Sequence, residues 1–189
     1  MTEQTIPAER SGQSSVVPGA ARSYTLIISA REQHGTLDRV VGVLRRRRAK
    51  PQTLTVVRSE LTGTLRITVV TDDSEVEVQQ LIEQLRKVAD VQQVINLSPE
   101  QAIARELALI KVNSSATRFN EIIEQGQTFG AHVIDVAQES VTFEVTGSSE
   151  KIEQVVRLLQ NYGVCEVVRT GYVAITRGND AQSTTFQTA

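Results

Sequence analysis

The sequence predicts an α+β protein built from two tandem ferredoxin-like halves, each with the element order βαββαβ. Two observations lead to this prediction. Apolar residues recur with helical spacing in four segments of the chain, and short apolar runs typical of strands separate these segments. With 189 residues, the chain is also long enough for two small domains but too short for two large ones.

Four helices are predicted from apolar residues at positions i, i+3, i+4 and i+7, which lie on one helical face. Ser74, followed three residues later by Glu77, forms a capping-box pattern that starts the second helix. The four apolar stripes are Leu37, Val40, Val41 and Leu44; Val78, Leu81, Ile82 and Leu85; Phe119, Ile122, Ile123 and Gly126; and Ile152, Val155, Val156 and Leu159.

The segments around these helices favour strands, because β-branched and other apolar residues alternate or cluster there. The predicted strands of the first half are residues 24–30, 53–58, 65–71 and 91–97. Those of the second half are residues 107–112, 133–136, 141–146 and 164–168, and residues 172–176 add one further strand.

In this fold both helices cover one face of each sheet, so the other face and the strand edges stay bare. Each half has only about 75 residues, a size at which a single core is marginal. Burying a bare face or an edge against a second copy would stabilise the protein. The fold therefore predicts a dimer through the first half.

Both ends of the chain are predicted to be flexible, since residues 1–22 and 179–189 are polar and show no periodicity. The two predicted domains are residues 23–98 and 104–178. The first segment has no apolar stretch of a secretory signal, and its acidic Glu3 and Glu9 argue against a mitochondrial presequence. We expect a cytoplasmic protein.

The composition disfavours several classes of protein. Apolar residues make up 40% and charged residues 22%, as in a soluble globular protein, and no apolar run approaches the roughly 20 residues of a transmembrane helix. A net charge of −2 and an aromatic content of 4% disfavour nucleic-acid binding. Cys165 is the single cysteine, which excludes a disulfide within the chain and zinc sites built from several thiolates.

Residues that carry chemistry are scarce. His34 and His132 are far apart and lack a partner at metal-ligand spacing, so a structural or surface role is expected for both. Cys165 lies between Val164 and Glu166 on a predicted strand and is interpreted as a small core residue. The sequence predicts neither a catalytic site nor a metal site in this chain.

A basic run, Arg45, Arg46, Arg47 and Arg48, lies at the end of the first predicted helix. Cations there complement the negative end of the helix dipole, which is the simpler interpretation. Binding to an acidic patch on a partner is the alternative.

One segment has the features of a ligand-binding loop, at the junction of the first strand and the first helix. A glycine in this position lets the backbone approach a ligand closely, and the free N–H groups of a helix start suit a carboxylate. A tight turn between strand and helix would also need a glycine. The residues of this loop are Glu32, Gln33, His34, Gly35, Thr36 and Leu37.

Two sets of motifs resemble a known family. Residues 35–42 (GTLDRVVG), followed by Leu-Thr-Val at 54–56, resemble the ACT domain that begins the regulatory subunit of acetolactate synthase. The second half resembles the carboxyl-terminal domain of that subunit, in order and at its spacing. Its matching stretches are RELALIKV at 105–112, FGAHVIDV at 129–136, VTGSSEKI at 145–152 and RTGYVAITRG at 169–178.

The resemblance implies a protein without its own active site. It would dock onto a large catalytic subunit that condenses two pyruvates, or pyruvate and 2-oxobutyrate, and would raise the activity of that subunit. Thiamine diphosphate, magnesium and FAD are expected only on this partner. In the family a branched-chain amino acid, usually valine, binds between two ACT domains and inhibits the assembly, and the backbone around the loop glycine, here Gly35, takes part.

The loop departs from the family pattern at two polar positions. Glu32 and Lys50 stand where the family usually has asparagine, and Arg48 replaces the glycine that usually ends the helix. An amide both donates and accepts hydrogen bonds, whereas an ionised Glu32 only accepts and Lys50 only donates. The ligand residues implied by the resemblance are thus Lys50 and the loop from Glu32 to Leu37, and we expect weak or absent valine binding.

Two other functions are compatible with this fold. RNA-binding modules of ferredoxin-like plan stack bases on sheet aromatics, but the third strands here present mostly aliphatic residues. A free-standing ACT-type amino-acid sensor, acting on another enzyme or on transcription, remains the alternative to a regulatory subunit. Co-purification with a large thiamine-diphosphate enzyme would distinguish the two.

Overall fold

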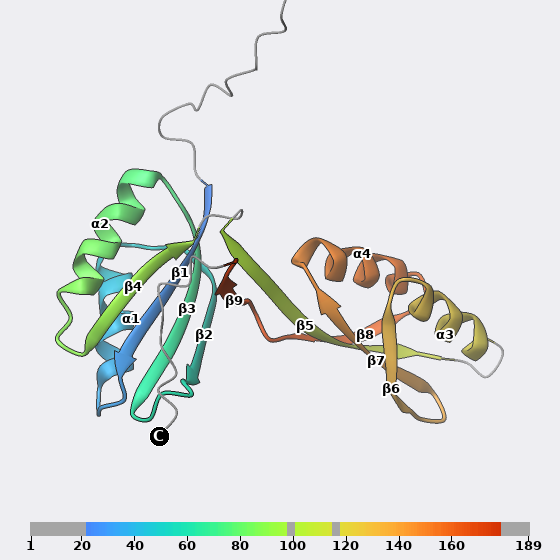
Figure 1. Cartoon of the computed structure of the whole chain (residues 1–189). Coiled ribbons are helices and arrows are strands. Elements are labelled where there is room, and N and C mark those ends of the chain that lie inside the picture. Colours follow the sequence, from blue (N-terminus) through green and yellow to red (C-terminus); the bar gives the residue numbers. More distant parts are fainter. Residues whose placement is uncertain (1–21, 98–100, 115–117, 179–189) are drawn as a thin grey trace, which may run out of the picture.

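The computed structural model describes residues 22–97, 101–114 and 118–178. It contains two α+β units, each an antiparallel sheet with two helices on one face (Figure 1). The predicted tails lie outside the described residues, except that Arg22 begins the first strand. No helix of the described part of the chain is long and apolar enough to span a membrane.

The first unit has the strand order β2-β3-β1-β4, with β1 central and β2 and β4 at the edges. Helices α1 and α2 bury their apolar stripes against this sheet, in a core that includes Leu26, Val40, Ile67 and Leu81. The elements are β1 (Arg22–Arg31), α1 (Thr36–Arg46), β2 (Pro51–Arg58), β3 (Thr64–Asp73), α2 (Glu75–Arg86) and β4 (Val91–Leu97).

The second unit repeats this plan with the order β6-β7-β5-β8. Its core surrounds Phe143, and a Cβ on Gly126 of α3 would lie 2.5 Å from the Phe143 ring, so only glycine fits there. The elements are β5 (Ala102–Asn113), α3 (Phe119–Thr128), β6 (Ala131–Val136), β7 (Ser140–Gly147), α4 (Ser149–Gln160), β8 (Val164–Arg169) and β9 (Val173–Thr176). The predicted ferredoxin-like fold of both halves is confirmed.

The start of α2 and the end of α1 are both closed by capping hydrogen bonds. The capping box predicted at α2 is present, since the Glu77 N–H donates to Ser74 Oγ and the Ser74 N–H donates to Glu77 Oε2. Helix α1 ends in a Schellman motif, in which the Ala49 N–H donates to the Leu44 carbonyl and the Arg48 N–H to the Arg45 carbonyl. Arg48 takes the left-handed φ of 54° that a glycine usually supplies.

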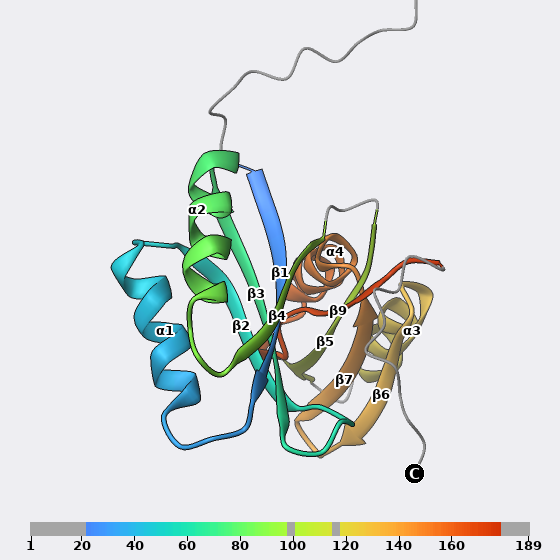
Figure 2. The same ribbon diagram turned by 60° about the vertical axis from the view of Figure 1, so that its left-hand side comes forward.

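Strand β5 connects the two units. Its first residues, from Ala102 to Arg105, pair with β9, and from Glu106 onward it pairs with β7. Ala102 and Ala174 of the β5–β9 ribbon pack on Ile27 and Leu97, which lie on the side of the first sheet opposite its helices. Figure 2 shows α1 and α2 on one side of this sheet and β5 and β9 on the other. The expectation that this face is bare is therefore wrong where the ribbon covers it.

Arg66 of β3 fixes the ribbon to the first sheet. Its Nη2 donates to the carbonyl oxygen of Ala174 at 2.7 Å, and Ala174 is almost fully buried. Burial of the guanidinium lowers the pKa of Arg66. The backbone of Gly171, with φ of 74°, lies so close to β2 that an added Cβ would be 3.3 Å from Thr53.

Three of the predicted core positions are corrected by the structure. Leu37 and Val41 of the first stripe are each 39% exposed, because the buried face of α1 is centred on Thr36, Val40, Val43 and Leu44, which leaves Leu37 and Val41 at its margin. Cys165 is exposed, since the pairing of β8 with β5 shifts register next to it, and its Sγ donates to the Lys111 carbonyl.

Candidate functional site

The loop between β1 and α1 is held by backbone hydrogen bonds, one of them to the turn between β2 and β3. The Glu32 N–H donates to the Gly63 carbonyl at 2.7 Å, and the Thr36 N–H donates to the Gln33 carbonyl at 3.1 Å. Gly35 has a left-handed φ of 78°, which a residue with a Cβ rarely adopts. The loop is thus a defined turn, and its backbone conformation accounts for the glycine at position 35.

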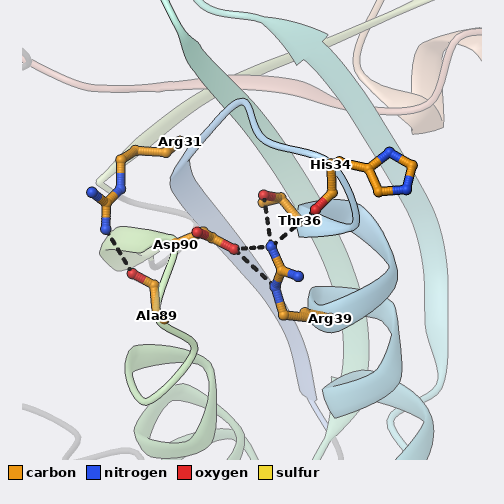
Figure 3. Close-up of polar contacts among 6 residues, drawn as sticks. All are labelled: Arg31, His34, Thr36, Arg39, Ala89 and Asp90. Carbon is orange, nitrogen blue, oxygen red and sulfur yellow. Dashed lines mark hydrogen bonds and ion pairs between the residues drawn. The ribbon is translucent and has the colours of Figure 1, made fainter.

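An ion pair between Arg39 and Asp90 lies next to this loop and holds it in place (Figure 3). Arg39 Nε donates to Asp90 Oδ2 at 2.8 Å, and Nη2 contacts the same oxygen, the His34 carbonyl at 3.2 Å and Thr36 Oγ1 at 3.5 Å. The Arg39 hydrogen bonds hold the pKa of the buried Asp90 carboxyl below its usual range. The first turn of α1 is thereby tied to the segment before β4.

The amino-terminal end of α1 presents donors to solvent. Within the described part of the chain, the backbone N–H groups of Leu37 and Asp38 have no hydrogen-bond acceptor, as is usual for the first turn of a helix. The positive end of the helix dipole lies at the same place. Free N–H groups next to Gly35 are suited to binding a carboxylate.

The structure separates the side chains of the sequence-predicted loop residues. Glu32, Gln33 and His34 are exposed, while Thr36 is buried. In Figure 3 the His34 ring points away from Arg39 and Asp90. Glu32 is already engaged, since Arg58 Nε donates to its Oε1 at 2.8 Å.

Lys50 does not lie at this loop. It follows the carboxyl-terminal end of α1, and a helix of 11 residues is about 16 Å long at about 1.5 Å per residue. Lys50 acts instead on Glu77 at the start of α2. Hydrogen bonds with Ser74 are the main cause that lowers the pKa of Glu77, and the positive charge of Lys50 lowers it a little further. A site that combines Lys50 with the Gly35 loop would need a second copy of the chain.

Arg39, Asp90 and Arg58 were not predicted as site residues. Arg39 lies in the GTLDRVVG stretch, so the sequence contained a signal for it. Asp90 is 51 residues further along the chain and carries no local pattern that would connect it to the loop.

Four apolar side chains are exposed on α1 and on the edge strand that follows it. Leu54 and Val56 of the edge strand β2 are 41% and 36% exposed and pair with Val69 and Ile67, so their side chains lie on the helix side of the sheet. Leu37 and Val41 of α1, which leads into β2, are exposed as well. We call Leu37, Val41, Leu54 and Val56 the α1–β2 surface.

The other candidate residues form no further site. His132 is exposed on β6, and no group of three or more metal-ligating side chains occurs among the described residues. His34 and His132 belong to different units.

Comparison with known proteins identifies the family. Residues 32–94 match the ACT domain model, and residues 105–178 match the model for the small subunit of acetolactate synthase. A probable acetolactate synthase small subunit of Methanothermobacter thermautotrophicus is 39% identical over 158 residues, which cover 82% of this chain and 94% of the relative. The chain belongs to the acetolactate synthase small-subunit family.

Other members of the acetolactate synthase small-subunit family agree with this assignment. The small subunit of Bacillus subtilis is 38% identical over 168 residues, covering 88% of this chain and 96% of the relative. The crystal structure of the small subunit from Thermotoga maritima has a TM-score of 0.78 at 30% identity and covers 84% of this chain and 99% of that chain. The likeness thus extends over both units and the described connection between them.

Proposed function

We propose that this chain is the regulatory subunit that binds and activates the thiamine-diphosphate-dependent catalytic subunit of acetolactate synthase, in the biosynthesis of valine, leucine and isoleucine. The observation that carries the proposal is the match to named small subunits through both halves, 39% identical over 94% of one relative. The chain itself contributes no catalytic group, and thiamine diphosphate, magnesium and FAD belong to the partner.

Activation follows from preferential binding. A small subunit raises turnover only if it binds the active conformation of the enzyme more tightly than the inactive one. A coupling free energy of about 1 to 3 kcal/mol corresponds to a roughly 5- to 150-fold effect. The chain offers a docking scaffold in which both cores are filled, including Phe143 in the second unit.

We also propose that the active form is a homodimer joined through the α1–β2 surface. Strand β2 is an unpaired edge of its sheet, and an edge next to exposed apolar side chains favours pairing with another copy. A two-fold interface is self-complementary, so one surface suffices. In such a dimer the carboxyl-terminal end of α1 in one copy comes within reach of the Gly35 loop in the other.

An amino-acid effector would bind in this dimer with reduced affinity. The N–H groups of Leu37 and Asp38 suit its carboxylate, and Lys50 would come from the second copy. Glu32, paired with Arg58, cannot donate to the carboxylate as an amide would. Losing a matched polar partner costs about 1 to 3 kcal/mol, so valine inhibition is expected to be weak or absent.

The test is acetolactate formation by the purified catalytic subunit, with and without this chain and with and without valine. We expect turnover at saturating pyruvate to rise on addition of the chain, with little response to valine. A complex that forms but leaves turnover unchanged would contradict activation. A solitary dimer that never co-elutes with the enzyme would favour a free-standing amino-acid sensor instead.

A further inference from the structure

The end of α1 carries a concentrated positive charge that the fold does not use. Arg45, Arg46, Arg47 and Arg48 are all exposed, and none of them forms an ion pair or a side-chain hydrogen bond within the described part of the chain. We call these four residues the arginine cluster. By contrast, Arg39, Arg58, Arg86, Arg157 and Arg169 each pair with a carboxylate.

Arg48 holds a conformation that disfavours its own side chain. Its φ of 54° is the left-handed value of a Schellman motif, where a glycine would be more stable. Local strain of this kind is a reason to look for a function of the residue that bears it. The helix dipole accounts for cations in the last turn of α1, where Arg45 and Arg46 lie, but not for a side chain at the strained position beyond it.

We propose that the arginine cluster is a docking site for an acidic surface of the catalytic subunit, an inference that rests on the proposed function. Guanidinium groups recognise carboxylates through paired hydrogen bonds. Arg45 and Arg46 lie in the last turn of α1, Arg47 is the C-cap and Arg48 is the left-handed residue after it, so the backbone changes direction along the cluster. The cluster thus faces outward in several directions and fits an acidic loop or helix start. Such contacts would orient the two subunits and speed their association.

The charge distribution favours a protein partner over a nucleic acid. The whole chain has a net charge of −2, so it lacks the broad positive field that tracks a phosphate backbone. Lys50 extends the positive region by one residue, but Glu75 and Glu77 begin α2 nearby, with Lys50 acting on Glu77. The positive region is therefore compact and bounded by acidic residues.

The experiment compares binding of the full chain to the purified catalytic subunit at increasing sodium chloride concentration. In one variant Arg45, Arg46 and Arg47 are replaced by glutamine. A control variant with Arg86, Lys87 and Arg157 replaced by glutamine loses the same charge at other exposed positions. At about 50 mM salt we expect about tenfold weaker binding for the cluster variant, less than twofold change for the control, and a flatter salt dependence for the cluster variant alone.

A second variant separates binding from folding. Arg48→Gly removes the strain and one charge, so the midpoint of urea denaturation should rise while binding to the catalytic subunit weakens about twofold. Loss of fold cannot produce that combination. A purely structural role of Arg48 predicts higher stability and unchanged binding, which would count against the inference.

The remaining outcomes also decide the matter. Equal affinity and equal salt dependence for the wild-type and cluster variants would overturn this inference and leave the proposed function standing. A wild-type chain that binds the catalytic subunit at no salt concentration would overturn both. Dissociation of the homodimer in the cluster variant, or loss of binding to a labelled DNA duplex with subunit binding unchanged, would assign the arginines to another partner and overturn the inference.

Discussion

Asp90 accepts a hydrogen bond from Arg39 Nε at 2.8 Å, although the two residues are 51 positions apart. The Asp90 side chain is 8% exposed and the Arg39 side chain 46%, so the carboxylate is covered while the guanidinium reaches the surface. This pair connects the first turn of α1 with the loop before β4, and Arg31 Nη2 binds the neighbouring Ala89 carbonyl. The Gly35 loop depends on it for its position.

Asp90→Asn should lower the thermal midpoint at pH 7. The amide retains the shape of the carboxylate but loses the negative charge that Arg39 binds. Removing the charged partner of a guanidinium at a buried position lowers the free energy of unfolding. Differential scanning calorimetry is the measurement. Glu83→Gln, which breaks an exposed pair with Arg86, is the control and should change the midpoint little. Equal midpoints for the Asp90 variant and wild type would contradict a stabilising role of the pair.

The same residue predicts a pH dependence. The folded state lowers the pKa of Asp90, chiefly through the Arg39 hydrogen bonds, so the carboxylate stabilises the fold above the unfolded value of about 3.9. This contribution is lost as the pH falls through the lower, folded pKa. Between pH 5 and pH 3, roughly, wild type should lose more stability than Asp90→Asn, as measured by urea denaturation at each pH. Parallel curves would refute the assignment.

Arg66→Met should loosen the β5–β9 ribbon. The change leaves the buried Ala174 carbonyl without its donor, at a cost of about 1 to 3 kcal/mol, while methionine still fills the apolar part of the space. Amide hydrogen exchange in residues 173–176 should become faster, with the cores of both sheets unchanged. Arg58→Met, on the edge strand β2, is the matched control and should leave this exchange as it is.

Replacing both Leu37 and Val41 by glutamate should produce a monomer, if the α1–β2 surface joins two copies. Each side chain is 39% exposed in the single chain, so the fold tolerates the change, but two buried carboxylates would oppose an interface. Light scattering at about 10 μM would report the mass. Val76→Glu, 67% exposed on α2, should remain a dimer. A dimeric double variant would place the interface elsewhere.

Glu32→Asn combined with Lys50→Asn should strengthen valine binding, because amides can both donate and accept at the positions where the charges stand. The gain is expected to be about tenfold or more, by titration calorimetry. Glu60→Asn, exposed between β2 and β3, is the control. A micromolar valine affinity of the unaltered chain would show that the backbone around Gly35 is sufficient without either amide.

Local patterns were enough to predict most of the fold. The helical stripes of α2 and α4 are buried at every predicted position. The stripe of α1 was predicted by the same spacing, yet Leu37 and Val41 are exposed. Spacing defines an apolar face of the helix but does not show which part of that face the rest of the unit covers.

The candidate site was harder to predict, because its contacts join residues that are far apart in the sequence. Gly35 has a local signature, and its positive φ agrees with the expectation of a tight turn. The Arg39–Asp90 pair and the hydrogen bond from Arg66 to Ala174 join residues 51 and 108 positions apart. Cys165 was wrongly predicted to be buried, because a shift in strand register is set by the partner strand and leaves no mark in the sequence of β8.

Strand β5 belongs to both units at once. Ala102 and Ala104 lie against the first sheet, and Ala108, Ile110 and Val112 on the same side of the same strand enter the core of the second unit. Side chains of a strand alternate between its two sides, so one inserted residue would turn every later side chain to the wrong side. The distance between the two units can therefore change only in steps of two residues, each step lengthening β5 by about 7 Å.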